Sequence, residues 1–198
     1  YLGGGTPSQL SIAQLEQLFI YINKVYGIGE DAEVTMECNP DDITDDYAQA
    51  ISRLPINRVS MGVQTFDDNR LRFLRRRHSS ENVYKAVERL RQAGIKNISI
   101  DLMYGFPNQT VDEWRLDIEK AISLNVEHIS AYSLMFEEGT PLFKMLESKK
   151  IKEADEEQSL EMFNSLIDTL TAAGYEHYEI SNFAKPGFRS RHNSSYWQ

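Results

Sequence analysis

The sequence predicts an α/β protein whose parallel strands are joined by crossover helices and form most of a (β/α) barrel. Short strand-like runs alternate with amphipathic helical patterns along the chain, which is typical of parallel strands connected by helices. Five such units follow one another within about 135 residues, a spacing that suits a barrel, open or closed. The first turn lacks the G-x-G-x-x-G fingerprint of dinucleotide-binding folds, because its three glycines are consecutive and a proline follows.

Length and composition are those of a globular protein. The 198 residues, 41% of them hydrophobic and 26% charged, are enough for a substantial core. The net charge of −9 argues against general nucleic-acid binding. One cysteine excludes an intramolecular disulfide, and no apolar run reaches the length of a membrane span. We therefore expect a cytoplasmic protein, with peripheral association with a membrane left open.

The chain opens with two apolar residues, three glycines and a Thr-Pro-Ser sequence (residues 1–8). Because glycine has no Cβ, such a run lets the backbone approach a ligand closely. Placed between a strand and a helix, the turn also offers free N–H groups to a carboxylate or phosphate. A flexible loop without a ligand is the alternative interpretation.

Helices are predicted from apolar periodicity and from residues that cap helix ends. Ser11 with Gln14 and Thr110 with Glu113 form capping boxes. The predicted helices cover residues 11–26, 44–54, 67–74, 80–93, 110–124 and about 155–173. After the strand-like opening segment, the predicted strands cover residues 33–38, 58–63, 97–102, 128–134 and 176–180.

Polar side chains follow most of these strands, at the barrel end where ligands bind. The candidates are Gly3 to Thr6, Glu37 to Pro40, Gln64, Asp101 with Tyr104, and Ser133 to Met135. Glu37 and Asp101 end otherwise apolar strands, where an unpaired carboxylate would be costly to bury. We expect Gly5, Glu37, Gln64 and Asp101 to converge on one pocket; a satisfied structural network is the alternative.

Four motifs carry a resemblance to a known family. They are Gly3-Gly4-Gly5-Thr6-Pro7, Glu37-x-Asn39-Pro40, Ser60 to Phe66 and Asp101 to Pro107. In this order, and at strand ends, they resemble the radical S-adenosylmethionine proteins around oxygen-independent coproporphyrinogen III oxidase. The resemblance implies a partial (β/α)6 barrel that holds a [4Fe-4S] cluster and S-adenosylmethionine. Residues 1–150 are then the barrel core, and residues 151–198 are the last helix–strand unit and the start of a truncated C-terminal region.

The resemblance also implies a cofactor site. Glu37 resembles the carboxylate that takes the amino group of the cofactor, and Arg76 the arginine that pairs with its carboxylate. Gly4, Gly5 and Thr6 resemble the residues that contact the methionine end of the cofactor. Gln64 and Asp101 resemble the residues that contact its ribose hydroxyls. Met135, which lies outside a clear motif, resembles the residue that contacts its adenine.

One part of the family pattern lies outside this sequence. The family holds its cluster with a C-x-x-x-C-x-x-C loop on the strand before the glycines, and this chain starts after that loop. Cys38 is not one of those ligands; a small buried strand residue and a reactive thiol are its two interpretations. We therefore expect no metal ligands within this chain, and expect the first strand and the cluster loop upstream of it. The missing initiator Met and the closing aromatic pair also indicate a fragment.

The end of the chain resembles one branch of the family. His192-Asn193-Ser194-Ser195-Tyr196-Trp197 resembles the H-N-x-x-Y-W motif of the haem chaperones. The resemblance implies haem binding through His192, Asn193, Tyr196 and Trp197, with an axial imidazole and stacked aromatic rings, and transfer of haem to acceptor proteins. A structural histidine is the alternative. The basic stretch Arg75 to Ser79 also resembles that branch, and we expect Arg77 to be solvated.

Two other functions stay open. One is the oxidase itself, which decarboxylates two propionates of coproporphyrinogen III. The other, from outside the family, is a phosphate-binding barrel enzyme that uses Glu37 and Asp101 as acid and base. Whether the protein is an enzyme is therefore not decided by the sequence.

Overall fold

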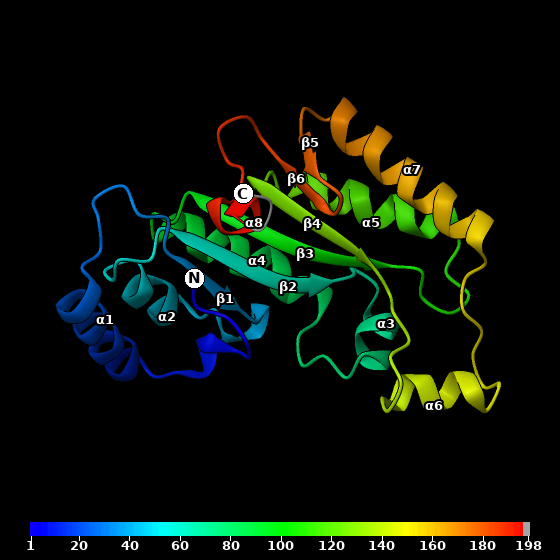
Figure 1. Cartoon of the computed structure of the whole chain (residues 1–198), viewed down its shortest axis with the longest axis horizontal. Helices are drawn as coiled ribbons and strands as arrows, with labels where there is room; N and C mark the ends of the chain where they lie inside the picture. Colours follow the sequence, from blue (N-terminus) through cyan, green and yellow to red (C-terminus); the bar gives the residue numbers. More distant parts are fainter. Residues whose placement is uncertain (196–198) are drawn as a thin grey trace.

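The computed structural model describes residues 1–195 and contains one mixed six-stranded sheet (Figure 1). Strands β1 to β4 run parallel to one another, as predicted. The strands are β1 (Thr35–Cys38), β2 (Arg58–Gln64), β3 (Asn97–Tyr104), β4 (His128–Ser133), β5 (Glu176–Glu179) and β6 (Asn182–Ala184), in the order β1-β2-β3-β4-β6-β5. This mostly parallel sheet confirms the α/β fold class.

The two ends of the sheet add details to the prediction. Leu2 forms a parallel bridge with Met36 beside β1, so the opening segment joins the sheet as expected. At the other end, β6 pairs antiparallel with both β4 and β5. The predicted strand at residues 176–180 therefore runs in the same direction as β4, but it pairs with an unpredicted three-residue strand, β6, which lies between β4 and β5. The division of the chain at residue 150 stays a prediction.

Helices connect the strands, and several of them cover the outer face of the sheet. The helices are α1 (Ile12–Tyr26), α2 (Asp45–Ile51), α3 (Asp68–Phe73), α4 (Ser80–Gln92), α5 (Val111–Ser123), α6 (Pro141–Glu147), α7 (Glu156–Ala172) and α8 (Arg191–Ser195), with short 3-10 turns η1 (Pro7–Gln9) and η2 (Pro40–Asp42). Both predicted capping boxes, at Ser11 and Thr110, are present. In Figure 1, α4 and α5 lie behind the strands, whereas the N-terminal segment and α8 lie in front.

Alternation along the strands separates an apolar face from a polar one. In β2, Val59, Met61 and Val63 are fully buried toward the helices, and each contributes roughly 1.5–3 kcal/mol by leaving water. Ser60 and Gln64 lie on the opposite, inner face. The same period of two gives the other parallel strands one apolar and one polar face, so polar groups line the concave side of the barrel.

Two buried side chains, Trp114 and Arg58, form hydrogen bonds within the helix layer and at the start of strand β2. Trp114 of α5 is fully buried and donates a hydrogen bond from Nε1 to the carbonyl oxygen of Met162 in α7 at 3.0 Å. Arg58, at the start of β2, is 2% exposed and donates to the carbonyl oxygen of Phe188 at 3.1 Å. Within residues 1–195, none of the helices combines the length and the apolar character needed to cross a bilayer.

Candidate functional site

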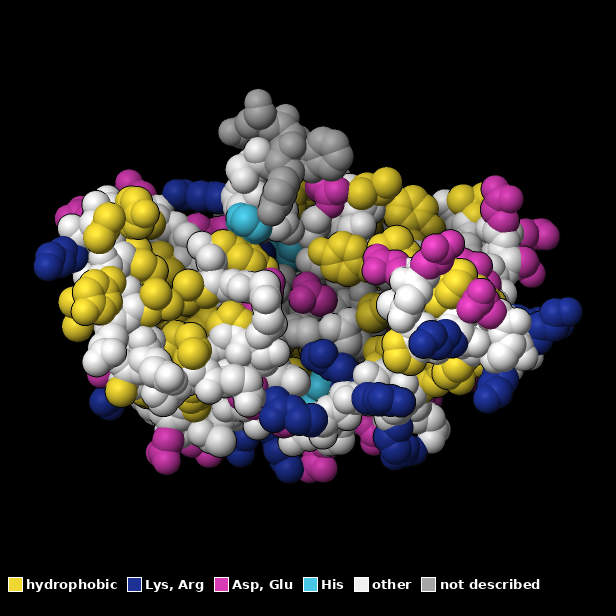
Figure 2. Space-filling model, turned by 60° about the horizontal axis from the view of Figure 1, so that its bottom comes forward, with side chains coloured by type: hydrophobic (Ala, Val, Ile, Leu, Met, Phe, Trp, Pro, Cys, Tyr) yellow, Lys and Arg dark blue, Asp and Glu magenta, His cyan; other side chains and the backbone are white. Residues whose placement is uncertain are grey.

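A polar pocket of about 200 Å³ lies at the C-terminal ends of β1, β2 and β3. The structure brings Gly5, Glu37, Gln64 and Asp101 around this one pocket, which is the convergence expected from the sequence. Its lining residues are Gly5, Thr6, Glu37, Cys38, Asn39, Ser60, Gly62, Gln64, Arg76 and Asp101. Figure 2 shows a hollow near the middle of this face with acidic and basic side chains around it.

The end of β2 is bent at the pocket. The register with β3 shifts between Gly62 and Gln64, and Gln64 has φ of 70°. This left-handed conformation is uncommon for a residue with a Cβ. Such bulges redirect a side chain next to a functional site, and here the bulge brings the Gln64 amide into the pocket.

Gly62 lets Arg76 approach the backbone of β2. Nη2 of Arg76 donates to the carbonyl oxygen of Gly62 at 2.8 Å, and a Cβ at position 62 would lie 2.9 Å from both Nη2 of Arg76 and Nε2 of Gln64. Nε of Arg76 is buried and has no hydrogen-bond partner among the described residues. Burial lowers the pKa of this guanidinium, which nevertheless stays charged near neutral pH. The pocket thus contains a cation with an unused donor.

A buried histidine holds the pocket wall beside β1. Nδ1 of His78 lies 3.1 Å from Oδ1 of Asn39, and Nε2 lies 3.1 Å from the carbonyl oxygen of Val63. Burial lowers the pKa of His78, so its imidazole is neutral at pH 7 and bridges the ends of β1 and β2. Its neighbour Arg77 is half exposed and pairs with Asp42 at 3.0 Å, as expected for a solvated basic residue.

Asp101 lies on β3 between the pocket and a second, inner cavity. Burial raises its pKa to about 7, and the nearby Glu37 acts in the same direction, while hydrogen bonds from Ser130 and Ser60 and the charge of Arg58 lower it. Near neutral pH the carboxyl is therefore present in both protonation states. The protonated carboxyl can donate a hydrogen bond to a ligand hydroxyl, and the ionised carboxylate can accept one from it.

Glu37 is held by the N-terminal segment. Tyr1 donates a hydrogen bond from its phenol to Oε1 of Glu37 at 2.8 Å. The backbone N–H of Glu37 donates to the carbonyl oxygen of Leu2 at 3.0 Å. The carboxylate therefore faces the pocket from a fixed position.

The inner cavity, of about 120 Å³, lies between the first residue and the end of the described chain. It is lined by Tyr1, Thr35, Glu37, Arg58, Ser60, Ser99, Asp101, His128, Ser130, Tyr132, Ser190 and Asn193. Nδ1 of His128 lies 2.8 Å from Oγ of Ser99, and Nε2 lies 2.7 Å from the hydroxyl of Tyr178. Burial, with the charge of Arg58, lowers the pKa of His128 well below its usual value. This imidazole is a neutral part of the barrel interior.

Several predicted site residues lie away from the pocket. Met135 follows β4, is 70% exposed and does not line the pocket. Gly4 has φ of 80°, a turn conformation suited to glycine, but also does not line it. His192 and Asn193 lie in α8, on the inner side of the sheet. Tyr196 and Trp197 lie outside the described residues, so their role and the cofactor roles of the other residues stay predictions.

The pocket residues fit one of the two implied cofactors. The Glu37 carboxylate matches the ammonium group of S-adenosylmethionine, and the Arg76 guanidinium, with its free buried donor, matches the cofactor's carboxylate. Gln64 and Asp101 match the ribose hydroxyls. The [4Fe-4S] cluster does not fit, because it needs several thiolates and the sequence has one cysteine. Burial raises the pKa of the Cys38 thiol. Among residues 1–195 there is no group of three His, Cys, Asp or Glu side chains that could hold a metal.

Three residues that line the pocket, Ser60, Gly62 and Asn39, have no cofactor role among the sequence predictions, although Asn39 is one of the candidates at strand ends. Strand periodicity could have identified two of them, because Ser60 and Gly62 precede Gln64 by four and two residues and so face the same side of β2. Asn39 was a candidate because it follows a strand, although an Asn-Pro pair at that place is also typical of an ordinary turn.

Comparison with known proteins places this geometry in a family. A protein-family model described as "Radical SAM superfamily" matches residues 1–121. Proteins named heme chaperone HemW from Lactococcus lactis and Escherichia coli are 40% and 35% identical over 100% of this chain, which covers 52% and 51% of their lengths. A zebrafish protein named radical S-adenosyl methionine domain-containing protein 1, mitochondrial, is 33% identical over 100% of this chain and 45% of its own length. The chain thus spans about half the length of these relatives.

A solved structure shows the same arrangement. The coproporphyrinogen III oxidase HemN of Escherichia coli, described as a radical SAM enzyme, superposes with a TM-score of 0.83 at 28% identity, covering 94% of this chain and 43% of HemN. The archaeal Elp3 of Methanocaldococcus infernus, at 22% identity and a TM-score of 0.69, shares the fold. With a family match over more than half of the sequence, the chain belongs to the Radical SAM superfamily.

Proposed function

We propose that this chain forms the cofactor-binding barrel of a haem chaperone, which binds haem and passes it to acceptor proteins. The observation that carries the cofactor part is the convergence of Glu37, Gln64, Arg76 and Asp101 on one pocket. Identity of 40% and 35%, over the whole chain, to relatives named heme chaperones supports the haem part. A [4Fe-4S] cluster bound by residues outside this chain and a cytoplasmic location belong to the same proposal.

In the pocket, each side chain has a distinct task. The Glu37 carboxylate, held by Tyr1 through Oε1, accepts the cofactor's ammonium, and the free Nε of Arg76 donates to its carboxylate. Gln64 and Asp101 bind ribose hydroxyls, with Gly5 and Thr6 next to the methionine end. S-adenosylmethionine bound beside a cluster supplies radical chemistry; the present residues bind and orient it.

The haem site begins in α8. Nδ2 of Asn193 donates to Oδ1 of Asn182 in β6 at 3.0 Å, and the backbone N–H of Arg191 donates to Oε1 of Glu33 at 3.0 Å. These bonds attach the helix to both edges of the inner barrel face. His192 then supplies the axial nitrogen, and Tyr196 and Trp197 the aromatic contacts to the porphyrin.

Titration of the full-length protein with haemin tests the proposal. We expect a saturable Soret change in the wild type, weakened at least tenfold in His192→Ala because the axial ligand is lost. His177→Ala is the matched control, since His177 packs between Phe163 and Phe183 at the other side of the sheet. A wild-type protein without a saturable change, or equal binding by His192→Ala, would contradict it.

The second candidate is coproporphyrinogen III oxidase, favoured by the close superposition on HemN. Anaerobic turnover of coproporphyrinogen III by the full-length protein with S-adenosylmethionine would support it over the chaperone. The phosphate-binding barrel enzyme was a hypothesis outside the family, and membership of the Radical SAM superfamily removes its basis.

A further inference from the structure

Tyr1 contacts both proposed sites. Its phenol donates to Oε1 of Glu37 at 2.8 Å, and its ring stacks on the imidazole of His192, with the ring centroids 4.0 Å apart and the ring planes at 21°. Glu37 lines the cofactor pocket. His192 is the proposed haem ligand. One side chain therefore joins a carboxylate and an imidazole that are 155 residues apart in the sequence.

The backbone next to Tyr1 is bonded to the sheet. The backbone N–H of Leu2 donates to the carbonyl oxygen of Thr35 at 2.8 Å, which ties the segment to β1. A Cβ on Gly3 would lie 2.7 Å from both Cε1 of Tyr1 and Oε1 of Glu37, so the ring and the carboxylate pack closely over this glycine. Burial and the hydrogen bond to Glu37 raise the phenol pKa, so the hydroxyl remains a donor throughout the neutral range.

The position of His192 is fixed separately. Nη1 of Arg191 donates to the carbonyl oxygen of Asp31 at 2.6 Å, and its backbone N–H donates to Glu33, just before β1. Asn193 is bonded to Asn182 in β6. Because α8 is attached on both sides of His192, a movement of the Tyr1 ring changes the environment of the imidazole rather than displacing the helix.

We propose that Tyr1 is a positioning residue that couples the two sites, so that a cofactor ammonium on Glu37 and haem iron on His192 strengthen each other's binding. The inference rests on the proposed function and concerns regulation of the same two sites. An ammonium bound to the Glu37 carboxylate changes the hydrogen bond between this carboxylate and the Tyr1 phenol, and hence the environment of the imidazole stacked on the Tyr1 ring. Because the linkage is thermodynamic, it acts equally in both directions.

Haemin titrations of the full-length protein, with and without S-adenosylmethionine, test the coupling. In the wild type we expect haem to bind about fivefold more tightly when the cofactor is present, a typical size for coupling between sites. In Tyr1→Phe the ring stack on His192 remains but the hydrogen bond to Glu37 is lost. The cofactor should then increase haem affinity by less than about twofold. In Tyr1→Leu, haem binding without cofactor also weakens. Tyr26→Phe, on the exposed end of α1, retains the wild-type factor.

A second readout needs no haem. In full-length protein with labelled histidines, the His192 imidazole resonances shift when S-adenosylmethionine is added, and this shift is lost in Tyr1→Phe. The inference would be overturned if Tyr1→Phe kept the coupling of the wild type. It would also be overturned if the wild type bound both ligands but the cofactor changed neither haem affinity nor the His192 resonances. A protein whose His192 resonances respond to the cofactor but which binds no haem would instead overturn the haem part of the proposed function.

Discussion

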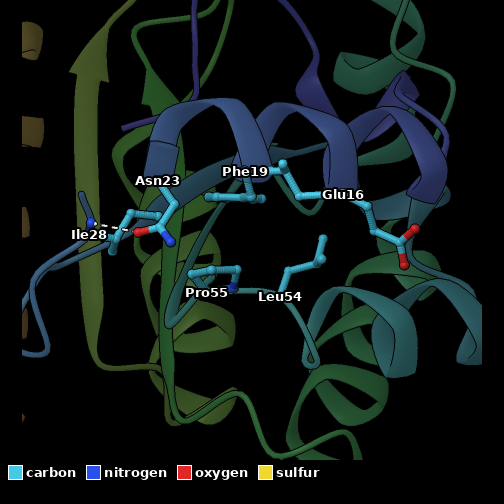
Figure 3. A pocket seen from close by; sticks show the side chains of 7 residues that line it. Glu16, Phe19, Asn23, Ile28, Leu54 and Pro55 are labelled. Carbon is cyan, nitrogen blue, oxygen red and sulfur yellow. Dashed lines mark hydrogen bonds between the residues drawn. The ribbon is translucent and has the colours of Figure 1, made fainter. Parts of the chain in front are cut away.

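Two of the hollows in the molecule have opposite character. The polar pocket at the strand ends has a volume of about 200 Å³, whereas a groove between α1 and the segment after α2 has about 530 Å³. Figure 3 shows the groove, with Phe19 and Asn23 of α1 on one side and Leu54 and Pro55 on the other. Oδ1 of Asn23 there accepts a bond from the backbone N–H of Ile28 at 3.0 Å.

The difference shows that size does not identify the site. The groove is lined mainly by apolar residues where one helix packs beside a loop, and one of its two polar residues, Asn23, closes the end of that helix. The pocket collects charged and amide groups from four separate segments of the chain, with a bulge, an unpaired guanidinium donor and a titrating carboxyl. Ligand sites combine a concave surface with a few placed polar groups, and in this molecule the smaller hollow has them.

The largest effect we expect separates stability from binding. Phe19 is 5% exposed and lies in the core beside the groove, so Phe19→Ala should lower the free energy of unfolding by about 3 kcal/mol through lost burial and a cavity. Urea unfolding measures this change. Cofactor affinity of the folded variant should stay within twofold of the wild type. A larger loss of affinity would show that the groove side of the barrel also determines binding.

The same substitution in each hollow tests which one binds the cofactor. Glu37→Gln removes the carboxylate charge that we propose to bind the cofactor ammonium, and we expect S-adenosylmethionine affinity to fall about 100-fold, or about 2.7 kcal/mol. Glu16→Gln changes a groove residue in the same way and should leave affinity unchanged. Calorimetric titration of the full-length protein measures both. Equal effects of the two substitutions would remove the distinction between the hollows.

The titration of Asp101 should appear in the pH dependence of stability. Its folded pKa of about 7 lies above the ordinary value of 3.8, so folding binds a proton between these values. The free energy of unfolding then falls as pH rises through this range, by about 1.4 kcal/mol per pH unit. Asp101→Asn should remove this slope, and Asp168→Asn on the exposed side of α7 should keep it. The measurement is the difference in the free energy of unfolding between pH 5 and pH 6.5. An equal difference in the wild type and in Asp101→Asn would contradict the assignment.

The smallest effect concerns the close approach at Gly62. Gly62→Ala would place a methyl group 2.9 Å from the Arg76 and Gln64 side chains and displace both, weakening cofactor binding by about tenfold, or 1.4 kcal/mol. Gly29→Ala has open space around its Cβ and serves as the control. Unchanged affinity in Gly62→Ala would mean that neither side chain contributes in its present position.

Local signals were sufficient for most elements. The capping residues Ser11 and Thr110 placed helix starts correctly, because an N-cap is a contact between neighbours in the sequence. Helix α6 and strand β6 were missed. The first is one short helix after Thr140-Pro141, which also reads as a turn, and the second is three residues long and is a strand because β4 and β5 lie on either side of it.

The amino-acid order by itself determined the α/β class, the parallel strands and three of the polar strand ends that meet at the pocket, those with Glu37, Gln64 and Asp101, because parallel strands align their C-terminal ends whatever connects them. Only the tertiary structure decided which residues share a contact: Arg76 on Gly62, His78 on Asn39, and Tyr1 between Glu37 and His192. Contacts between residues far apart in the chain depend on how helices and sheet pack, and no local pattern records them.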